Sequence, residues 1–304
     1  MKPLLPGLVA APHTPFKANG DVALKTIPDQ ARLLARNGVI GAFICGTTGE
    51  GSSLTSDERR QVVESWMANK PAKLAIIVHV GHLCYRESQA LAEHAQKSGA
   101  TAVATIAPSF FKPTSVVELV DWCAGVAAAA PHLPFYYYHM PAMTGVTIGA
   151  TAFLERAHGR IPNLAGVKFT HENLMDFSQA GQVAGGKYEI LFGRDEILLA
   201  GLSLGALGAV GSTYNFAAPL FNRILRAHAA GHLAAARRDQ AKAMTLISLL
   251  HRNGGLAAGK VAMKLIGLDL GPMRLPIRTL SAAQEKSLHS ELKEVGFFEF
   301  ASKA

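Results

Sequence analysis

The sequence is poor in cysteine and has no blocks of like charge. Its 304 residues include three cysteines, Cys45, Cys84 and Cys123, which lie far apart and form no C-x-x-C pair. This spacing argues against a disulfide framework and against a zinc ribbon. Hydrophobic residues make up 49% of the chain and charged residues 17%, with neither sign gathered into a run. The composition is typical of a folded globular protein and argues against a disordered one.

Long apolar runs are also missing. No stretch approaches the roughly 20 residues that cross a bilayer, and Met1–Leu5 carry no long apolar core of a secretion signal. We therefore expect a cytoplasmic protein with no membrane partner. The net charge of +8 comes from scattered basic residues, and the densest pairs, Arg59-Arg60 and Arg237-Arg238, fall in helical patterns. A solvated helix face explains such pairs, so no nucleic-acid partner is predicted and the charge supports at most a weak attraction of anionic substrates.

Short apolar segments alternate with helical patterns along the first two thirds of the chain. The candidate strands are Gly7–Ala11, Gly41–Cys45, Ala75–Val80, Ala102–Ala107, Pro134–His139, Ala165–Phe169, Glu189–Phe192 and Ala206–Gly211. Strands that alternate with helices are parallel and are joined by right-handed crossovers. Eight such units predict an α/β fold, a (β/α)8 TIM barrel, with a doubly wound open sheet as the alternative.

Helix starts and breaks organise the remainder of the chain. Residues Thr55 and Glu58, Ser115 and Glu118, and Ser281 and Gln284 have capping-box spacing. After Leu220 the pattern is helical, with predicted helices at Phe221–Arg237, Gln240–His251 and Gly259–Ile266 and breaks at Gly254-Gly255 and Gly271-Pro272. We expect residues 1–220 to form the barrel and residues 221–304 to form C-terminal helices packed on it, as one structural domain.

The ends of the candidate strands are the places to look for reactive groups, since loops converge there in a barrel. The second strand is followed by Gly46-Thr47-Thr48-Gly49-Glu50-Gly51, in which hydroxyl and amide groups can hold a carboxylate or a phosphate. A plain strand-to-helix turn explains the same residues. Spacing alone leaves both interpretations open for Thr47 and Thr48.

A lysine and a tyrosine follow on neighbouring strands. Lys168 lies among apolar residues near the end of the sixth strand, where removal from water favours a neutral amine that can attack a ketone. A lysine that extends past the strand end to solvent is the alternative. Tyr136 and Tyr138 share one face of the fifth strand. Tyr138 lies nearer the strand end and is the better placed for proton transfer, although packing explains any single aromatic residue.

The seventh and eighth strands end in polar residues. Asp195 and Glu196 can accept hydrogen bonds from a hydroxylated ligand, or they can cap the helix that follows, and the sequence favours neither interpretation. His79 and His82 have no matching acidic or cysteine cluster, so an ordinary buried histidine is favoured and no metal site is predicted. Cys45 is interpreted as a small buried hydrophobe.

Taken together, Gly46–Glu50, the Tyr138 strand and Gly166-Val167-Lys168 resemble the family of pyruvate-dependent class I aldolases that includes dihydrodipicolinate synthase and N-acetylneuraminate lyase. The resemblance covers essentially the whole chain. Residues 136–145, 191–196 and 208–215 are more similar to the N-acetylneuraminate lyase branch, particularly its animal type.

The resemblance implies a Schiff-base (oxo-acid) lyase that cleaves N-acetylneuraminate, a sialic acid, to N-acetylmannosamine and pyruvate. Lys168 would form the imine and Tyr138 would move the proton. The segment around Thr47 and Thr48 would hold the carboxylate. The remaining implied positions are Gly193, Asp195, Glu196 and Ser212 along the sugar tail and Thr170 near the lysine. The resemblance also implies a homotetramer and a reaction that needs no metal or organic cofactor.

Two departures from the family pattern matter. Ala142-Met143-Thr144 lacks the arginine that binds a second carboxylate in the synthases, so a dihydrodipicolinate synthase activity is disfavoured. Phe110 and Phe111 stand where many relatives place a relay tyrosine, and a phenyl ring cannot transfer a proton. Tyr138 would then depend on Thr47 or on the substrate carboxylate. The alternatives are a pyruvate aldolase or dehydratase for another 2-keto-3-deoxy sugar acid, and a non-catalytic sugar-acid-binding protein.

Overall fold

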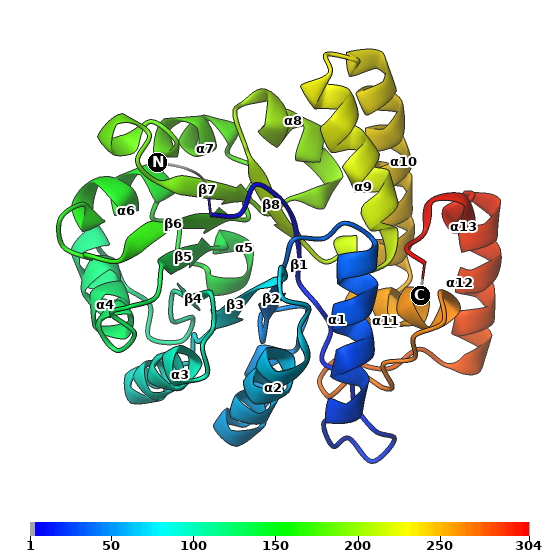
Figure 1. Cartoon of the computed structure of the whole chain (residues 1–304), viewed down its shortest axis with the longest axis horizontal. Coiled ribbons are helices and arrows are strands. Elements are labelled where there is room, and N and C mark those ends of the chain that lie inside the picture. The colour runs from blue at the N-terminus through cyan, green and yellow to red at the C-terminus, as the bar shows by residue number, and fades with distance from the viewer. Residues whose placement is uncertain (1–3, 304) are drawn as a thin grey trace.

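A computed structural model describes residues 4–303, so only Leu4 and Leu5 of the segment Met1–Leu5 can be placed. Eight parallel strands close into a barrel in the order of the sequence (Figure 1). They are β1 (Gly7–Ala10), β2 (Gly41–Ile44), β3 (Ala75–His79), β4 (Ala102–Ile106), β5 (Phe135–His139), β6 (Leu164–Phe169), β7 (Glu189–Phe192) and β8 (Gly208–Gly211). The first strand pairs with the last, which confirms the predicted (β/α)8 barrel and rules out the open sheet.

Helices surround the barrel and follow its strands. They are α1 (Ile27–Arg36), α2 (Ser56–Asn69), α3 (Tyr85–Lys97), α4 (Val116–Ala128), α5 (Pro141–Thr144), α6 (Ala150–Ala157), α7 (Leu174–Ala180), α8 (Leu198–Ser203) and α9 (Tyr214–Ala229). The capping boxes predicted for α2 and α4 are both formed, with reciprocal side-chain and backbone hydrogen bonds. Within residues 4–303, no helix combines the length and the apolar character that a membrane span requires.

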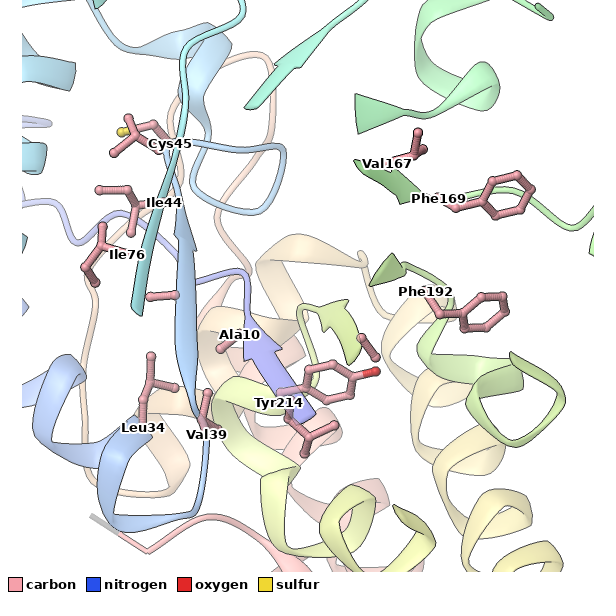
Figure 2. Close-up of a cluster of buried hydrophobic side chains, with 14 of the residues drawn as sticks. Ala10, Leu34, Val39, Ile44, Cys45, Ile76, Val167, Phe169, Phe192 and Tyr214 are labelled. Carbon is pink, nitrogen blue, oxygen red and sulfur yellow. The ribbon is translucent and has the colours of Figure 1, made fainter. Parts of the chain in front are cut away.

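Alternation along each strand divides the side chains between two cores. Val167 and Phe169 point outward from β6 and pack among the apolar residues between strands and helices (Figure 2). Lys168, between them in sequence, therefore points into the barrel. On β5, Tyr136 and Tyr138 belong to the interior cluster and Tyr137 to the outer one, as the predicted shared face requires.

The C-terminal extension is helical, but the boundaries predicted at residue 221, at residues 237–240 and at residue 259 were wrong. Its helices are α10 (Leu233–Arg252), α11 (Leu256–Leu265), α12 (Ala282–Glu294) and α13 (Phe297–Phe300), and α12 begins with the predicted capping box. The chain breaks at Gly231, which has φ +73°, and not near residue 238, since the polar cluster there lies on the surface of one continuous helix. α11 begins at Leu256, three residues before the predicted start.

The extension continues the barrel without a separating linker. Residue 220, the expected boundary, falls inside α9, the helix that follows β8. Figure 1 shows α9, α10, α12 and α13 gathered on one side of the barrel. An ion pair between Arg223 and Asp239, 2.9 Å between nitrogen and oxygen, joins α9 to α10. Residues of α10 and α11 lie close to residues at the carboxyl ends of the strands.

Candidate active site

A cavity of about 260 Å³ opens at the carboxyl end of the barrel. All nine predicted site residues line it, namely Thr47, Thr48, Tyr138, Lys168, Thr170, Gly193, Asp195, Glu196 and Ser212. They come from the ends of five strands, β2 and β5 to β8. The structure thus brings together every candidate that the sequence proposed, and their individual roles remain predictions.

The lysine and the tyrosine are direct neighbours across the sheet. Tyr138 of β5 and Lys168 of β6 are partners in the strand register. The Lys168 Nζ atom lies 3.7 Å from the centroid of the Tyr138 ring and 4.3 Å from that of Phe43. Only 5% of Lys168 is exposed, and no carboxylate among residues 4–303 pairs with it. The amine therefore ends inside the cavity between two aromatic faces, and not in bulk solvent.

The Tyr138 hydroxyl has weak protein partners. It lies 2.9 Å from the Met140 Sδ atom, a poor acceptor, and 3.4 Å from the Thr47 Oγ1 atom. Phe110 and Phe111 are 76% and 86% exposed and do not line the cavity in this chain. Thr47 therefore provides the hydroxyl beside Tyr138. This is the residue on which the sequence analysis suggested that Tyr138 could depend for proton transfer.

The glycine-rich loop, residues 46–51, is a series of turns closed by backbone hydrogen bonds. The Gly51 amide donates to the Gly46 carbonyl at 3.0 Å, and the Glu50 amide to the Thr47 carbonyl at 3.1 Å. Glu50 has φ +52°, in the left-handed region that residues other than glycine rarely adopt. A closed loop with this backbone presents Thr47 and Thr48 to the cavity from a fixed frame.

The paired carboxylates at the end of β7 have different surroundings. Asp195 is buried, and its Oδ2 atom accepts hydrogen bonds from the Thr213 amide at 3.0 Å and the Thr213 hydroxyl at 2.5 Å. Burial raises the pKa of Asp195 to about 6. Glu196 is partly exposed and lies 3.2 Å from Arg194, which also pairs with Glu172. Asp195 thus supports the β8–α9 turn through Oδ2, while Glu196 is the more exposed of the two acceptors.

A close backbone approach accounts for Gly193. A Cβ atom at this position would lie 2.1 Å from the Thr170 Oγ1 atom. Thr170 is buried, and its hydroxyl has no hydrogen-bond partner among the described residues. Glycine at 193 therefore leaves room for the Thr170 hydroxyl beside the lysine strand.

Three predictions about residues other than Lys168 and Tyr138 can be compared with the structure. His79 is buried, and its Nδ1 atom lies 3.1 Å from the Cys45 carbonyl, which confirms an ordinary buried histidine. Burial lowers the pKa of His79 to about 3 and raises that of Cys45 to about 11. Cys45 is thus a buried thiol, as predicted. No cluster of three or more metal-ligating side chains occurs within residues 4–303.

Sequence reasoning missed part of the cavity wall. Met140 continues the alternation of the inward-facing residues of β5, Tyr136 and Tyr138, and that signal could have identified it. Arg194 was passed over as a neighbour of the carboxylates. The C-terminal helices add a further set, Ile247, Leu250, His251, Gly255, Leu256 and Gly259. No local pattern could show that this face of α10 and α11 meets the strand ends.

Comparison with known proteins agrees with this geometry. A family model described as the dihydrodipicolinate synthetase family matches residues 4–295. The chain belongs to this family. N-acetylneuraminate lyase from Rattus norvegicus is 41% identical over 98% of this chain and 95% of its own length. This relationship confirms the resemblance that the motifs indicated.

Solved structures place the chain near the same branch of the family. The structure described as Proteus mirabilis N-acetylneuraminate lyase is 43% identical, with a TM-score of 0.94 over 96% of this chain and 99% of that one. A native N-acetylneuraminate lyase from Aliivibrio salmonicida is 42% identical, with a TM-score of 0.95 over 98% of each chain. The barrel and its C-terminal helices are therefore shared with these proteins along nearly their whole length.

Proposed function

We propose that this protein is an N-acetylneuraminate lyase, a class I aldolase that cleaves N-acetylneuraminate to N-acetylmannosamine and pyruvate. The observation that carries the proposal is the position of Lys168, whose amine ends inside the cavity 3.7 Å from the centre of the Tyr138 ring. Relatives above 40% identity along nearly the whole chain bear the name of this activity. The closed loop, residues 46–51, supplies hydroxyl and amide groups for the carboxylate.

In the first step the Lys168 amine attacks the C2 ketone of the substrate, and water leaves as the imine forms. The cavity suits this step because the amine is buried and lies clear of any carboxylate partner within the described residues. Thr47 and Thr48 would hold the substrate carboxylate on the adjacent loop. The ketone carbon would thereby be fixed next to the amine.

Cleavage then breaks the C3–C4 bond. Tyr138 takes the proton of the C4 hydroxyl while its own proton passes to the substrate carboxylate, either directly or through the Thr47 hydroxyl 3.4 Å away, which releases its own proton as it accepts one. The electron pair of the broken bond moves into the protonated imine to give an enamine, and the aldehyde N-acetylmannosamine leaves. Protonation at C3 and hydrolysis release pyruvate and restore the amine of Lys168.

The sugar tail would extend toward the ends of β7 and β8. Glu196, Gly193 and Ser212 line that part of the cavity, and Asp195 holds the turn behind them. Carboxylate and hydroxyl oxygens there suit a polyhydroxylated chain better than a short acid. We infer that this region sets the preference for long sugar acids.

The proposed reaction needs no metal and no organic cofactor. The protonated imine on Lys168 is itself the electron sink, so the carbon-carbon bond can break without another group. Full activity after treatment with a chelator and dialysis is expected. A loss of activity that a divalent cation restores would contradict this part of the proposal.

We further propose that the enzyme works as a homotetramer in the cytoplasm. The absence of a disulfide among the described cysteines fits a reducing compartment, because Cys45, Cys84 and Cys123 are all free. Light scattering coupled to size exclusion is expected to give four times the 32.2 kDa chain mass. A monomer at working concentration would overturn the assembly.

Borohydride trapping is the experiment that tests the reaction. Reduction of the protein with pyruvate should add a three-carbon unit to Lys168, which peptide mass spectrometry can locate. Turnover assays would then compare N-acetylneuraminate with shorter 2-keto-3-deoxy sugar acids. Preference for a shorter acid would assign the protein to another pyruvate aldolase, and ligand binding with no label and no pyruvate release would make it a sugar-acid-binding protein.

A further inference from the structure

The carboxylate-binding loop, residues 46–51, is held from the C-terminal extension by a buried ion pair. Glu50, at the end of the loop, lies 3.0 Å from the Lys260 Nζ atom of α11, and the two side chains are 0% and 4% exposed. The other Glu50 oxygen accepts the Arg274 amide at 2.8 Å. The Lys260 ammonium and the Arg274 amide, both from beyond the barrel, therefore meet the carboxylate of one loop residue.

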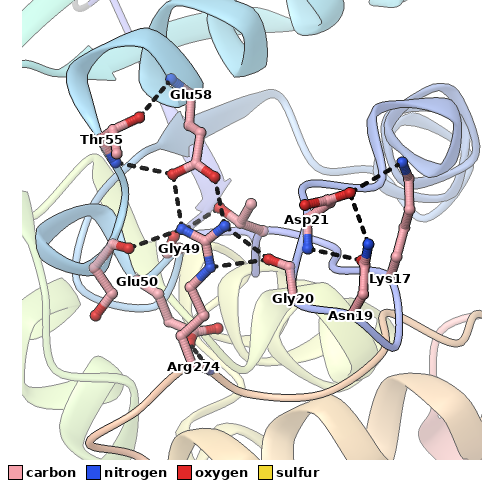
Figure 3. A network of polar contacts seen from close by, with 11 residues as sticks. Lys17, Asn19, Gly20, Asp21, Gly49, Glu50, Thr55, Glu58 and Arg274 are labelled. Atoms are coloured by element: carbon pink, nitrogen blue, oxygen red, sulfur yellow. Dashed lines mark hydrogen bonds and ion pairs between the residues drawn. The ribbon is translucent and has the colours of Figure 1, made fainter.

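Further contacts hold Lys260 and Arg274 in place. The Lys260 Nζ atom donates to the Pro272 carbonyl at 2.7 Å and lies 4.4 Å from the centre of the Phe16 ring. The Arg274 guanidinium donates to the Glu58 carboxylate and the Gly20 carbonyl (Figure 3). The ion pair is thus supported by neighbours on both sides.

The loop needs such support because its backbone is strained. Glu50 has φ +52° and Cys45, just before the loop, has φ +57°, so residues with side chains occupy the left-handed region at both ends. Such a conformation persists only where surrounding contacts hold it. A buried ion pair often contributes little net stability, but its direction fixes one arrangement of the groups that it joins.

The same helix also borders the cavity. Leu256 and Gly259 of α11 line the wall, and Lys260 follows directly. Thr47 and Thr48 of the same loop line the cavity together with Tyr138 and Lys168. A helix of the C-terminal extension therefore shapes part of the wall and anchors the adjacent loop.

We propose that Lys260 and Glu50 are positioning residues, which hold the loop so that Thr47 and Thr48 bind the carboxylate of the 2-keto acid. The inference rests on the proposed function. Loss of the pair should weaken binding of the keto acid and leave the chemistry on Lys168 intact. Neither residue is expected to touch the substrate.

The test titrates the full-length protein with pyruvate in the borohydride assay and records the fraction of Lys168 labelled. In Lys260→Met and Glu50→Gln we expect the half-saturating pyruvate concentration to rise about tenfold or more, with labelling at saturation still on Lys168. The matched control is Lys264→Met, one turn further along α11. This change removes an exposed ion pair with Glu285, in which nitrogen and oxygen lie 2.8 Å apart. Its half-saturation should equal that of the wild type.

The outcomes separate this inference from the proposed function. Unchanged half-saturation in both variants would overturn the positioning role, even where their melting temperatures fall, because a merely structural contact lowers stability without altering binding by the folded protein. If Lys260→Met does not fold, Glu50→Gln carries the test, since glutamine still accepts the Arg274 amide. Absence of label in the wild type would instead overturn the aldolase itself.

Discussion

Two tyrosines on one strand show how differently the two ends of the barrel are built. Tyr136 and Tyr138 lie on the same inward face of β5, one at the amino end and one at the carboxyl end. The Tyr136 hydroxyl donates to the Glu189 carboxylate at 2.5 Å, and the Leu5 amide donates to the same carboxylate at 2.9 Å. Among residues 4–303, the Tyr138 hydroxyl has only the Met140 sulfur and the more distant Thr47 hydroxyl as partners.

The difference indicates which end is arranged for stability and which for a ligand. At the amino end the Tyr136 hydroxyl and the Leu5 amide both donate to Glu189, so these three groups satisfy one another. At the carboxyl end the phenol and the amine of Lys168 lack strong protein partners within the described residues, which costs stability and leaves both groups available. A substrate would supply the missing partners.

Removal of the amine should have the largest effect. Lys168→Ala should lower turnover of N-acetylneuraminate by about 10⁴-fold or more, because no imine can form. The matched control is Lys187→Ala at the amino end, where the side chain is exposed and activity should be unchanged. Steady-state assays of both variants would check the comparison, and substantial turnover in Lys168→Ala would refute the mechanism.

Removal of the Tyr138 hydroxyl and removal of the Tyr136 hydroxyl should have different effects. Tyr138→Phe is expected to reduce kcat by about 10²- to 10⁴-fold while borohydride trapping of pyruvate persists, because only proton transfer is lost. Tyr136→Phe should leave kcat within about twofold and should lower the free energy of unfolding by about 1–3 kcal/mol, since Glu189 loses a donor. Equal kinetic effects in the two variants would remove the distinction between the ends.

How much of this was predictable depends on how local each signal is. The alternation that puts Tyr138 and Lys168 inside the barrel can be recognised from adjacent residues in the sequence. The closing of eight strands into a barrel then places the two residues side by side. Gly193 could be identified only through its family motif. The physical reason for a glycine there is the close approach of the Thr170 hydroxyl, which only the structure shows. Local patterns thus identified the residues but not their contacts.

The features that could not be predicted from the sequence are contacts between segments far apart in the chain. Lys260 is 210 positions from Glu50, and an α11 pattern of alanine and glycine gives no hint of a buried charge. The break at Gly231 was misplaced because the polar residues near 238 looked like a helix end. Similarly, the different roles of Asp195 and Glu196 became visible only when Thr213 was found bonded to the first.

The ends should differ in their response to acid. His13, buried at the carboxyl end, has its pKa lowered to about 3 by burial and by Lys260. The unfolded chain takes up a proton near pH 6.5 and the folded protein does not, so stability is lost as pH falls from 6.5 toward 3. One such histidine costs about 2 kcal/mol between pH 7 and pH 5.

We therefore expect the free energy of unfolding to fall about 2 kcal/mol less in His13→Leu than in the wild type between pH 7 and pH 5. Denaturant unfolding at both pH values measures this difference. The exposed His132→Gln should behave as the wild type does. Asp195, whose raised pKa opposes this trend between about pH 4 and 6, is present in all three proteins and cancels in the comparison. An identical acid response in His13→Leu would show that this histidine is not buried in its neutral form.

The smallest effect should come from Glu189 at the amino end. In Glu189→Gln the amide oxygen can still accept from Leu5 and the amide nitrogen can donate to Tyr136, so only the charge that strengthens both bonds is lost. We expect the free energy of unfolding to fall by about 1 kcal/mol and kcat/KM to stay within about twofold. A large loss of activity would mean that the amino end is coupled to the site through β5, and the division between a satisfied end and an available end would then no longer hold.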